Sequence, residues 1–258
     1  MEAAPDRQIL LIDPDARAMA TGSDHRDVVG YNVQAAVDTK HHIVVANVVT
    51  NRGHDRSHLL EMAKAAQAEI GALGMITLAD RGYYEGEQIR SYAPAGIIPM
   101  VPKPDTPPAP ARGLWAKVMF VYGPETDTYR CPAGQHLQKH HATVEAGKRL
   151  KVYYNQKACS ACPSRPLCTA GKEKRIRRWE HEAVLDEMER RFKAMPDAMA
   201  VRRCTVEHVF GTIKGWMGAT HFRTRGLKKV ATETNLTILA YNLKRASQSR
   251  ESPRHSQR

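Results

Sequence analysis

The hydrophobic pattern of the first fifty residues is that of three short strands. Apolar, largely β-branched runs separated by polar stretches occupy residues 8–13, 31–38 and 41–50. The second and third runs are joined by a short polar turn at Thr39–Lys40, which predicts that they pair as a hairpin. The first run ends on Asp13 and the second on Asp38.

Beyond residue 57 the pattern changes to alternating helices and strands. Apolar positions at helical spacing predict a helix that ends near Ile70, and the run MITLAD predicts a buried strand that ends on Asp80. A short helix at residues 85–92 and a strand at residues 96–102 follow. Three antiparallel strands followed by alternating helices and parallel strands are typical of a ribonuclease-H-like fold. We therefore expect an α/β protein with a mixed sheet and flanking helices.

The chain changes character after residue 101. Residues 102–113 contain five prolines and predict a linker, and residues 114–178 carry cysteines, histidines and short strand-like runs without a long periodic helix. Helical patterning returns near residue 180 and continues toward the C-terminus. The predicted segments are a first part of the core at 8–101, a linker with a cysteine-rich insertion at 102–178, a helical completion of the core at 179–246 and a disordered tail at 247–258.

Charge narrows the range of partners. The formal net charge is +12 and the isoelectric point is near 9.6, which favours a polyanion such as nucleic acid, although a basic surface without a specific partner has the same composition. No apolar stretch approaches the roughly 18 residues of a membrane span, and the N-terminus MEAAPDRQ lacks the layout of a secretory signal. We expect a cytoplasmic protein that does not bind membranes.

Two places carry acidic residues in a setting that suits chemistry on phosphates. Asp80 follows the apolar strand, and on the late helix Arg203, Glu207 and Lys214 are spaced to share one face. Each feature also has a simpler interpretation, because an aspartate after a strand often caps a turn. An exposed Arg–Glu pair at this spacing contributes only a few tenths of a kcal/mol, roughly, to helix stability.

Together these residues resemble a known family. The segments GYNVQAAVD, LADRGYY, CPAG and TVEHVFGTIKGWMG, in this order over roughly residues 13–245, are similar to the DDE transposases of bacterial insertion sequences, in the branch with a cysteine-rich insertion. The resemblance implies a ribonuclease-H-like catalytic domain that uses Mg²⁺ or Mn²⁺. It also implies cleavage of double-stranded DNA at the ends of a mobile element, strand transfer into target DNA, a homodimer, and a place at the nucleoid when the protein is bound to DNA.

The family's site residues can be carried over where the motifs match. Asp80 resembles the second catalytic carboxylate and Glu207 the third, both as Mg²⁺ ligands, while Arg203 and Lys214 match basic residues that contact DNA phosphates. Ala200 stands where the related signature often has tyrosine, so the handling of a terminal base inferred from that tyrosine does not carry over.

The first catalytic carboxylate has no clear counterpart. The order of elements makes Asp13 the first candidate for this acid, with Asp15 and Asp38 as alternatives. Asp13 could equally form a turn ahead of Pro14. In this branch the first acid usually lies in a DGT-like strand before the DPDAR segment, and the chain contains no DGT. The comparison predicts that the first acid lies upstream of Met1. A truncated, inactive DNA-binding remnant is then the alternative function, and a nuclease that cuts without joining is a third.

The cysteines suggest a second metal. Cys131, Cys159, Cys162 and Cys168 have the spacing C-x27-C-x2-C-x5-C, which predicts a structural Zn²⁺ site. Reduced buried thiols, or mixed ligation by His136, His140 or His141, are the alternatives. The neighbouring run KEKRIRR predicts DNA-phosphate contacts by Arg175, Arg177 and Arg178, unless it is only a solvated charged face. Cys204 and the tryptophans Trp115, Trp179 and Trp216 are expected to be packing or interface residues.

Overall fold

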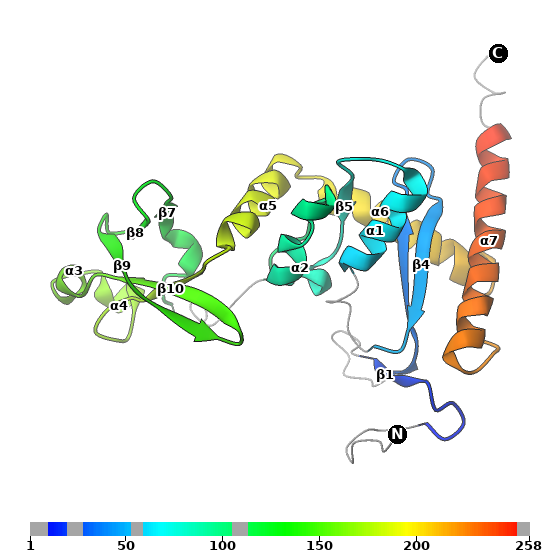
Figure 1. Cartoon of the computed structure of the whole chain (residues 1–258), viewed down its shortest axis with the longest axis horizontal. Helices are drawn as coiled ribbons and strands as arrows, with labels where there is room; N and C mark the ends of the chain where they lie inside the picture. Colours follow the sequence, from blue (N-terminus) through cyan, green and yellow to red (C-terminus); the bar gives the residue numbers. More distant parts are fainter. Residues whose placement is uncertain (1–9, 20–27, 53–58, 105–112, 252–258) are drawn as a thin grey trace. The chain divides into compact units, whose positions relative to one another are not determined.

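The chain forms a mixed α/β structure whose elements fall into two compact units (Figure 1). The computed structural model describes residues 10–19, 28–52, 59–104 and 113–251. One unit, called here the core unit, comprises the chain up to Lys103 and again from Glu187. The inserted unit comprises Pro104–Asp186, and the division falls within helix α5 (Glu182–Ala194).

The described strands of the core unit form three two-stranded sheets. They pair as β1 (Arg17–Met19) with β2 (Val28–Gly30), β3 (Asn32–Val37) with β4 (Val44–Thr50), and β5 (Ile76–Leu78) with β6 (Ile98–Met100), the last pair parallel and the others antiparallel. The predicted hairpin is thus confirmed as β3–β4. The expected first strand at residues 8–13 is not formed over its described part, because Leu10 and Asp13 make only an isolated bridge.

The helices of the core unit largely follow the periodicity of the sequence. They are α1 (Leu59–Ile70), α2 (Gly86–Arg90), the later part of α5, α6 (Ala198–Gly211) and α7 (Leu227–Glu251), with short 3-10 turns η1 (Arg81–Tyr83) and η2 (Ala93–Ala95) and a π-helical turn η5 (Thr212–Trp216). The apolar stripe predicted for the first helix is buried in α1. The tail predicted to be disordered from residue 247 is helical as far as Glu251, and its remainder lies outside the described residues.

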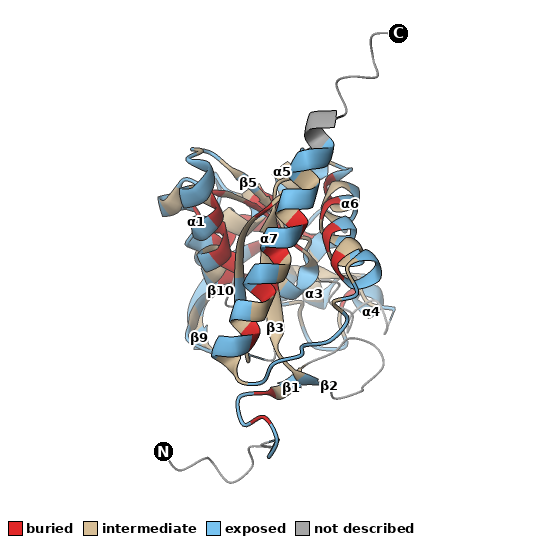
Figure 2. Ribbon diagram, turned by 90° about the vertical axis from the view of Figure 1, so that its right-hand side faces the viewer, coloured by how far each residue is buried: buried red, intermediate tan, exposed pale blue. Residues whose placement is uncertain are grey.

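Helix α7 docks on β4, whose other neighbours are β3 and α1 (Figures 1 and 2). A buried cluster from β4, α6, η5 and α7 lies between these elements, made of Val44, Val209, Ile213, Ile238 and Tyr241. The side-chain amide of Asn242 accepts a hydrogen bond from Val44 N at 3.0 Å and donates one to Val44 O at 2.8 Å. The side chain of Asn242 therefore forms the pair of hydrogen bonds with the β4 backbone that a neighbouring strand would otherwise form.

The beginning of α7 is capped by two aspartates that are distant in sequence. Gly226 N donates to the Asp13 carboxylate at 3.2 Å, and Leu227 N donates to the Asp15 carboxylate at 2.9 Å. Tyr31 binds the same oxygen of Asp13 at 2.7 Å. Because the first backbone N–H groups of a helix lack partners within it and carry partial positive charge, both carboxylates stabilise this helix end.

The inserted unit is built on a five-stranded antiparallel sheet in the order β11-β10-β9-β8-β7. Its strands are β7 (Val121–Gly123), β8 (Thr128–Arg130), β9 (His136–Glu145), β10 (Lys148–Tyr154) and β11 (Ile176–Trp179), and its short helices are η4 (Lys117–Met119), α3 (Gln156–Ser160) and α4 (Arg165–Cys168). The β9–β10 turn places Ala146 at φ 48° and Gly147 at φ 76°. Positive φ at both central residues suits a tight hairpin whose twist matches that of its strands.

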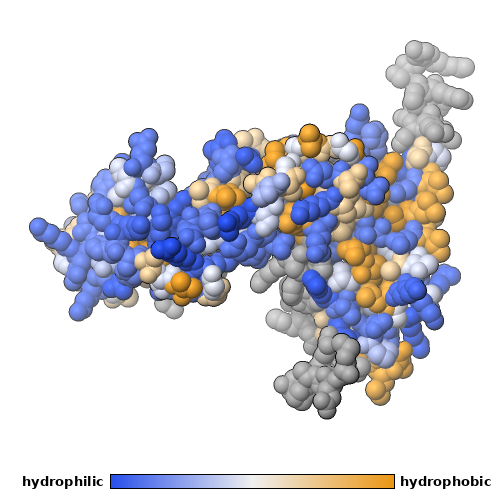
Figure 3. Space-filling view, in the orientation of Figure 1, coloured by the Kyte–Doolittle hydropathy of each residue, from blue (hydrophilic) through white to orange (hydrophobic). Residues whose placement is uncertain are grey.

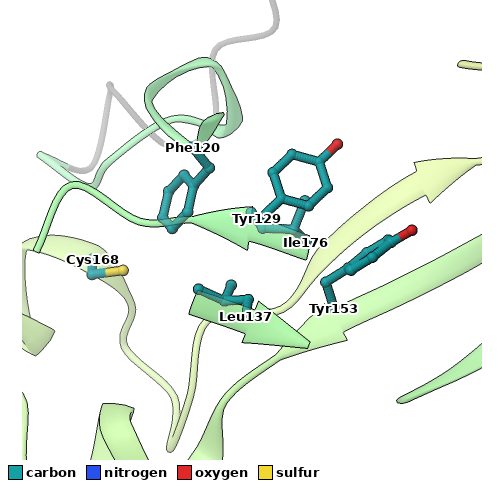
Figure 4. Close-up of a cluster of buried hydrophobic side chains, with 6 residues drawn as sticks. All are labelled: Phe120, Tyr129, Leu137, Tyr153, Cys168 and Ile176. Carbon is teal, nitrogen blue, oxygen red and sulfur yellow. The ribbon is translucent and has the colours of Figure 1, made fainter. Parts of the chain in front are cut away.

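Aromatic side chains dominate the core of this unit (Figure 4). The buried cluster consists of Phe120, Tyr129, Leu137, Tyr153, Cys168 and Ile176. At its edge, the Asp127 carboxylate accepts hydrogen bonds from Tyr153 at 2.6 Å and Tyr122 at 2.8 Å, and from Lys151 at 3.3 Å. The hydrogen bond from Tyr153, the largest cause, helps to lower the pKa of Asp127 from its usual 3.8 to about 2.

Asp127→Asn should destabilise the chain at neutral pH, and the loss should shrink as the solution becomes acidic. A lowered pKa in the folded state contributes stability above pH 3.8, and this contribution is lost as pH falls through the folded value of about 2. Asparagine tolerates the positive φ of 46° at this position, so backbone strain does not confuse the comparison. Urea unfolding of both proteins at pH 7, 4 and 3 measures the difference. An equal difference at all three values would contradict the assignment.

Candidate functional site

Asp80 is held at the end of β5 by two contacts. One carboxylate oxygen accepts from Gly82 N at 3.0 Å, which caps η1, and the other accepts from the Arg202 guanidinium at 2.9 Å. The second contact joins residues 122 positions apart and ties the strand end to α6. The sequence pattern did not predict this contact of Arg202, whose neighbour Arg203 is the predicted DNA-phosphate contact.

Asp80 lines a groove between β3 and β5 within the core unit. The groove is bordered by the length of β3, by residues 75–80, by the buried side of α1, and by Arg202, Thr205, Val206 and Phe210 of α6. Among the described strands β3 pairs only with β4, and β5 only with β6. In the expected mixed sheet β3 and β5 would belong to one sheet, and here the groove lies between them. Helices α1 and α6 line the groove together with these two strands.

Glu207 lies on the same helix as Arg202 but faces elsewhere. Five residues of α-helix correspond to a rotation of about 140° and a rise of about 7.5 Å. Glu207 is exposed and lines a second pocket, together with His208, Gly211, Thr212, Trp216, Tyr241, Lys244, Arg245 and Gln248. Asp80 thus contacts α6 through Arg202, and Glu207 is part of α6, but the two carboxylates line different pockets.

The candidates for the first carboxylate all have structural partners. Asp13 and Asp15 cap α7, and the Asp38 carboxylate accepts from His41 N at 2.6 Å in the β3–β4 turn. None of the three lines the groove that contains Asp80. The turn at Asp13 is made by its backbone, because Asp13 O accepts from Ala16 N at 3.1 Å, while one carboxylate oxygen is engaged by both Tyr31 and Gly226.

These placements bear directly on the magnesium site that the family resemblance implies. Such a site needs carboxylates that converge on one point. Asp80 and Glu207 line different pockets, and Asp13 lies apart from both at the start of α7. Within the part of the chain that the structure describes, no three His, Cys, Asp or Glu side chains form a group that could hold a metal ion. In this arrangement the three predicted carboxylates do not fit a shared Mg²⁺ site.

The basic run of the inserted unit divides into exposed and buried residues. Arg175 and Arg177 are exposed, with ion pairs to Glu173 at 2.7 Å and Glu145 at 3.2 Å. Arg178 is only 6% exposed. It binds Asp186 at 2.6 Å and the Tyr129 hydroxyl at 3.3 Å, and its guanidinium lies 3.7 Å from the centroid of the Tyr122 ring.

Arg178, predicted to contact DNA, is therefore a packing residue of the sheet. The physical reason is the two-residue period of β11, which turns Ile176 and Arg178 to the buried face and Arg177 to solvent. A run of basic residues does not by itself indicate which side chains are buried. The alternation of buried and exposed positions can be assigned only once the segment is known to be a strand.

The structure also places two predicted packing residues, Trp216 and Cys204, on the surface. Trp216 is 85% exposed, which excludes a core role, and it lies in the pocket with Glu207 and Lys244. Its position follows from the π-helical turn η5, which the sequence pattern did not predict. Cys204, expected to pack, is exposed on α6. The predicted DNA contacts Arg203 and Lys214 are both exposed.

Comparison with known protein families gives a match. Residues 130–247 match the family described as "Transposase DDE domain", which supports a DDE transposase and implies DNA as the substrate. The matched segment includes Arg203, Glu207 and Lys214 but not Asp80. No curated protein and no solved structure matches the chain. Among the described helices, none has the length and apolar character to cross a membrane.

Replacing Arg178 by methionine should lower the free energy of unfolding by about 2 kcal/mol, because it leaves the Tyr129 hydroxyl and Asp186 without their charged partner. The matched control is Arg177→Met on the same strand, whose side chain points to solvent and whose loss should cost little. Urea denaturation of the two variants and the parent measures both effects. If Arg177→Met were the more damaging change, the assignment of the buried face would be wrong.

Proposed function

We propose that this protein is a DNA transposase that cleaves double-stranded DNA at the ends of a mobile element and joins the freed strands to target DNA. The observation that carries the proposal is the match of residues 130–247 to a transposase DDE domain, in a segment where Glu207 lies among exposed basic residues. We place this activity at the nucleoid in the cytoplasm and propose a homodimer, because two element ends must be processed together.

The order of elements supports a ribonuclease-H-like core. A β-hairpin (β3–β4) is followed by α1, β5, α2 and a parallel strand β6, and the chain returns after the inserted unit as α6 and α7. In this proposal Asp80 and Glu207 are the catalytic acids. Arg202 holds Asp80 against α6 through their 2.9 Å ion pair, and binding of metal and DNA would have to bring the two carboxylates together from the separate pockets that they line.

The proposed DNA-binding surface surrounds the second pocket. Arg203 and Lys214 are exposed on α6 and η5, and the exposed Lys244 lines the same pocket as Glu207. Basic side chains on an exposed surface bind phosphates and thereby fix the position of DNA without reading its sequence. These cations would draw the phosphodiester backbone toward the acid on α6.

The catalytic proposal predicts nicking of supercoiled plasmid that carries the genomic DNA flanking the coding sequence. We expect nicking in Mg²⁺ or Mn²⁺ that EDTA abolishes. Asp80→Asn and Glu207→Gln should each reduce it by at least about a hundredfold, as loss of groups that take part in proton transfer or charge stabilisation does. Glu69→Gln, at an exposed carboxylate on α1, is the control and should nick normally.

The products of this assay separate the competing functions. Covalent joining of the flanking DNA to a second plasmid supports a transposase, whereas nicking without joining indicates a nuclease. Binding to DNA without nicking in either metal would support the alternative, a DNA-binding protein without catalysis. Normal nicking by Glu207→Gln would show that the third carboxylate is assigned to the wrong residue.

The binding surface predicts a change in salt dependence. Arg203→Ala and Lys214→Ala should each weaken binding of double-stranded DNA at all sequences and reduce the slope of log affinity against log salt by about 0.9. Lys64→Ala, at an exposed lysine on α1, should leave the slope unchanged. Fluorescence anisotropy of a labelled duplex between low and moderate salt measures the slope. Equal slopes for all proteins would place the DNA elsewhere.

A further inference from the structure

The four cysteines of the inserted unit meet at one small cavity, although they come from separate parts of the chain. Cys131 directly follows β8, Cys159 lies in α3, Cys162 follows α3, and Cys168 ends α4. All four line the same cavity, whose volume is about 20 Å³. A space of this size holds about one water-sized body.

Among the residue types that commonly bind zinc, cysteine alone lines this cavity. Its lining contains the four cysteines and no aspartate, glutamate or histidine. Cys131, Cys159, Cys162 and Cys168 are free thiols. A set made only of thiol donors favours Zn²⁺ over Mg²⁺, which prefers oxygen ligands.

The histidines offered as alternative ligands lie elsewhere in the inserted unit. The His136 ring is 3.4 Å from the Thr128 hydroxyl, and the His140 ring stacks on Tyr154 with centroids 3.6 Å apart. His141 also contacts Tyr154, edge to face. None of the three lines the cysteine cavity, so the structure favours four thiols over mixed ligation.

Tight backbone turns follow two of the cysteines. Cys131 O accepts from Gly134 N at 2.9 Å, and Cys131 N donates to Gln135 O at 2.8 Å, in a turn that needs the positive φ of 80° at Gly134. Cys159 O accepts from Cys162 N at 3.3 Å, and Cys162 O in turn accepts from Arg165 N at 3.1 Å. These turns fix the backbone of Cys131 on one segment of the chain and of Cys159 and Cys162 on another.

The local charge suits a thiolate centre. Zinc with four thiolates carries a net charge of −2, and two cationic residues, Lys174 and Arg165, line the cavity. Lys174 Nζ is anchored by Cys168 O at 3.2 Å and Trp115 O at 2.8 Å, so its charge is fixed at this place. Burial raises the pKa of the Cys168 thiol, and the charge of Lys174 opposes that rise.

We propose that Cys131, Cys159, Cys162 and Cys168 bind one structural Zn²⁺ ion as four thiolates, with release of their protons. As the structure places them, these side chains do not form a metal-holding group, so binding requires the thiols to turn into the cavity. The ion would link the β8–β9 turn to α3 and α4, next to the small aromatic and aliphatic core of the inserted unit (Figure 4). This site is separate from the proposed DNA chemistry.

The test begins with the full chain purified under reducing conditions without chelator. Elemental analysis should give one zinc per chain. Replacement of zinc by Co²⁺ should produce the visible absorption of tetrahedral cobalt together with sulfur-to-cobalt charge-transfer bands. Chelation should lower the midpoint of thermal unfolding. A chain with no zinc that also develops no cobalt spectrum would overturn the proposal.

Variants then assign the ligands. Cys131→Ser, Cys159→Ser, Cys162→Ser and Cys168→Ser should each reduce zinc content by at least half and weaken the charge-transfer bands, whereas Cys204→Ser, at the exposed thiol on α6, should change neither. Should a variant fail to fold, titration of the parent with a thiol reagent decides: the four cluster thiols should react only after chelation. Four thiols that react at once in the zinc-loaded parent, or thiols missing because they form disulfides, would contradict the assignment.

Discussion

The core unit depends on the docking of α7 against the backbone of β4. Asn242 donates to and accepts from Val44, and the Tyr241 hydroxyl donates to His42 O at 2.7 Å, so polar groups of the strand edge that would need another strand are satisfied by a helix. Each such bond contributes about 1 kcal/mol net, while leaving a buried edge group unpaired would cost more. Because α6 packs into the same cluster through Val209, this docking also sets where Arg202 and Glu207 stand.

The elements that the sequence predicted are those whose formation is local. The β3–β4 hairpin, helix α1 and strand β5 follow from periodicity and turn residues within a few positions of each element. Residues 8–13 carry an apolar run of the same kind, yet Asp13 is drawn to the amide groups at the start of α7, more than two hundred positions away. A contact of that range is not encoded in a local pattern, and it determines the conformation of the segment.

The candidate site shows the same division. Motif order singled out Asp80 and Glu207, whose catalytic roles stay a prediction, and the structure places Asp80 after β5 and Glu207 exposed on α6. Which arginine reaches Asp80 depends on the rotation of α6 about its axis, since neighbouring residues differ by about 100°. Likewise Arg178 is buried and Trp216 exposed because of a strand period and a π-helical turn, neither visible in residue type alone. The surface of α7 is likewise not predictable from residue type: Figure 3 shows apolar side chains over this helix, and Leu236, Leu239 and Leu243 are more than half exposed.

The interruption of the core unit by residues 104–186 has a consequence for how the chain emerges from the ribosome. Val44 and Asn242 are 198 positions apart, so β4 leaves the exit tunnel long before the helix that covers its edge has been synthesised. During that interval the nascent hairpin presents an open strand edge, while the inserted unit, rich in adjacent hairpins, can complete its own sheet. The early half of the core unit is thus the part of the nascent chain most in need of a chaperone.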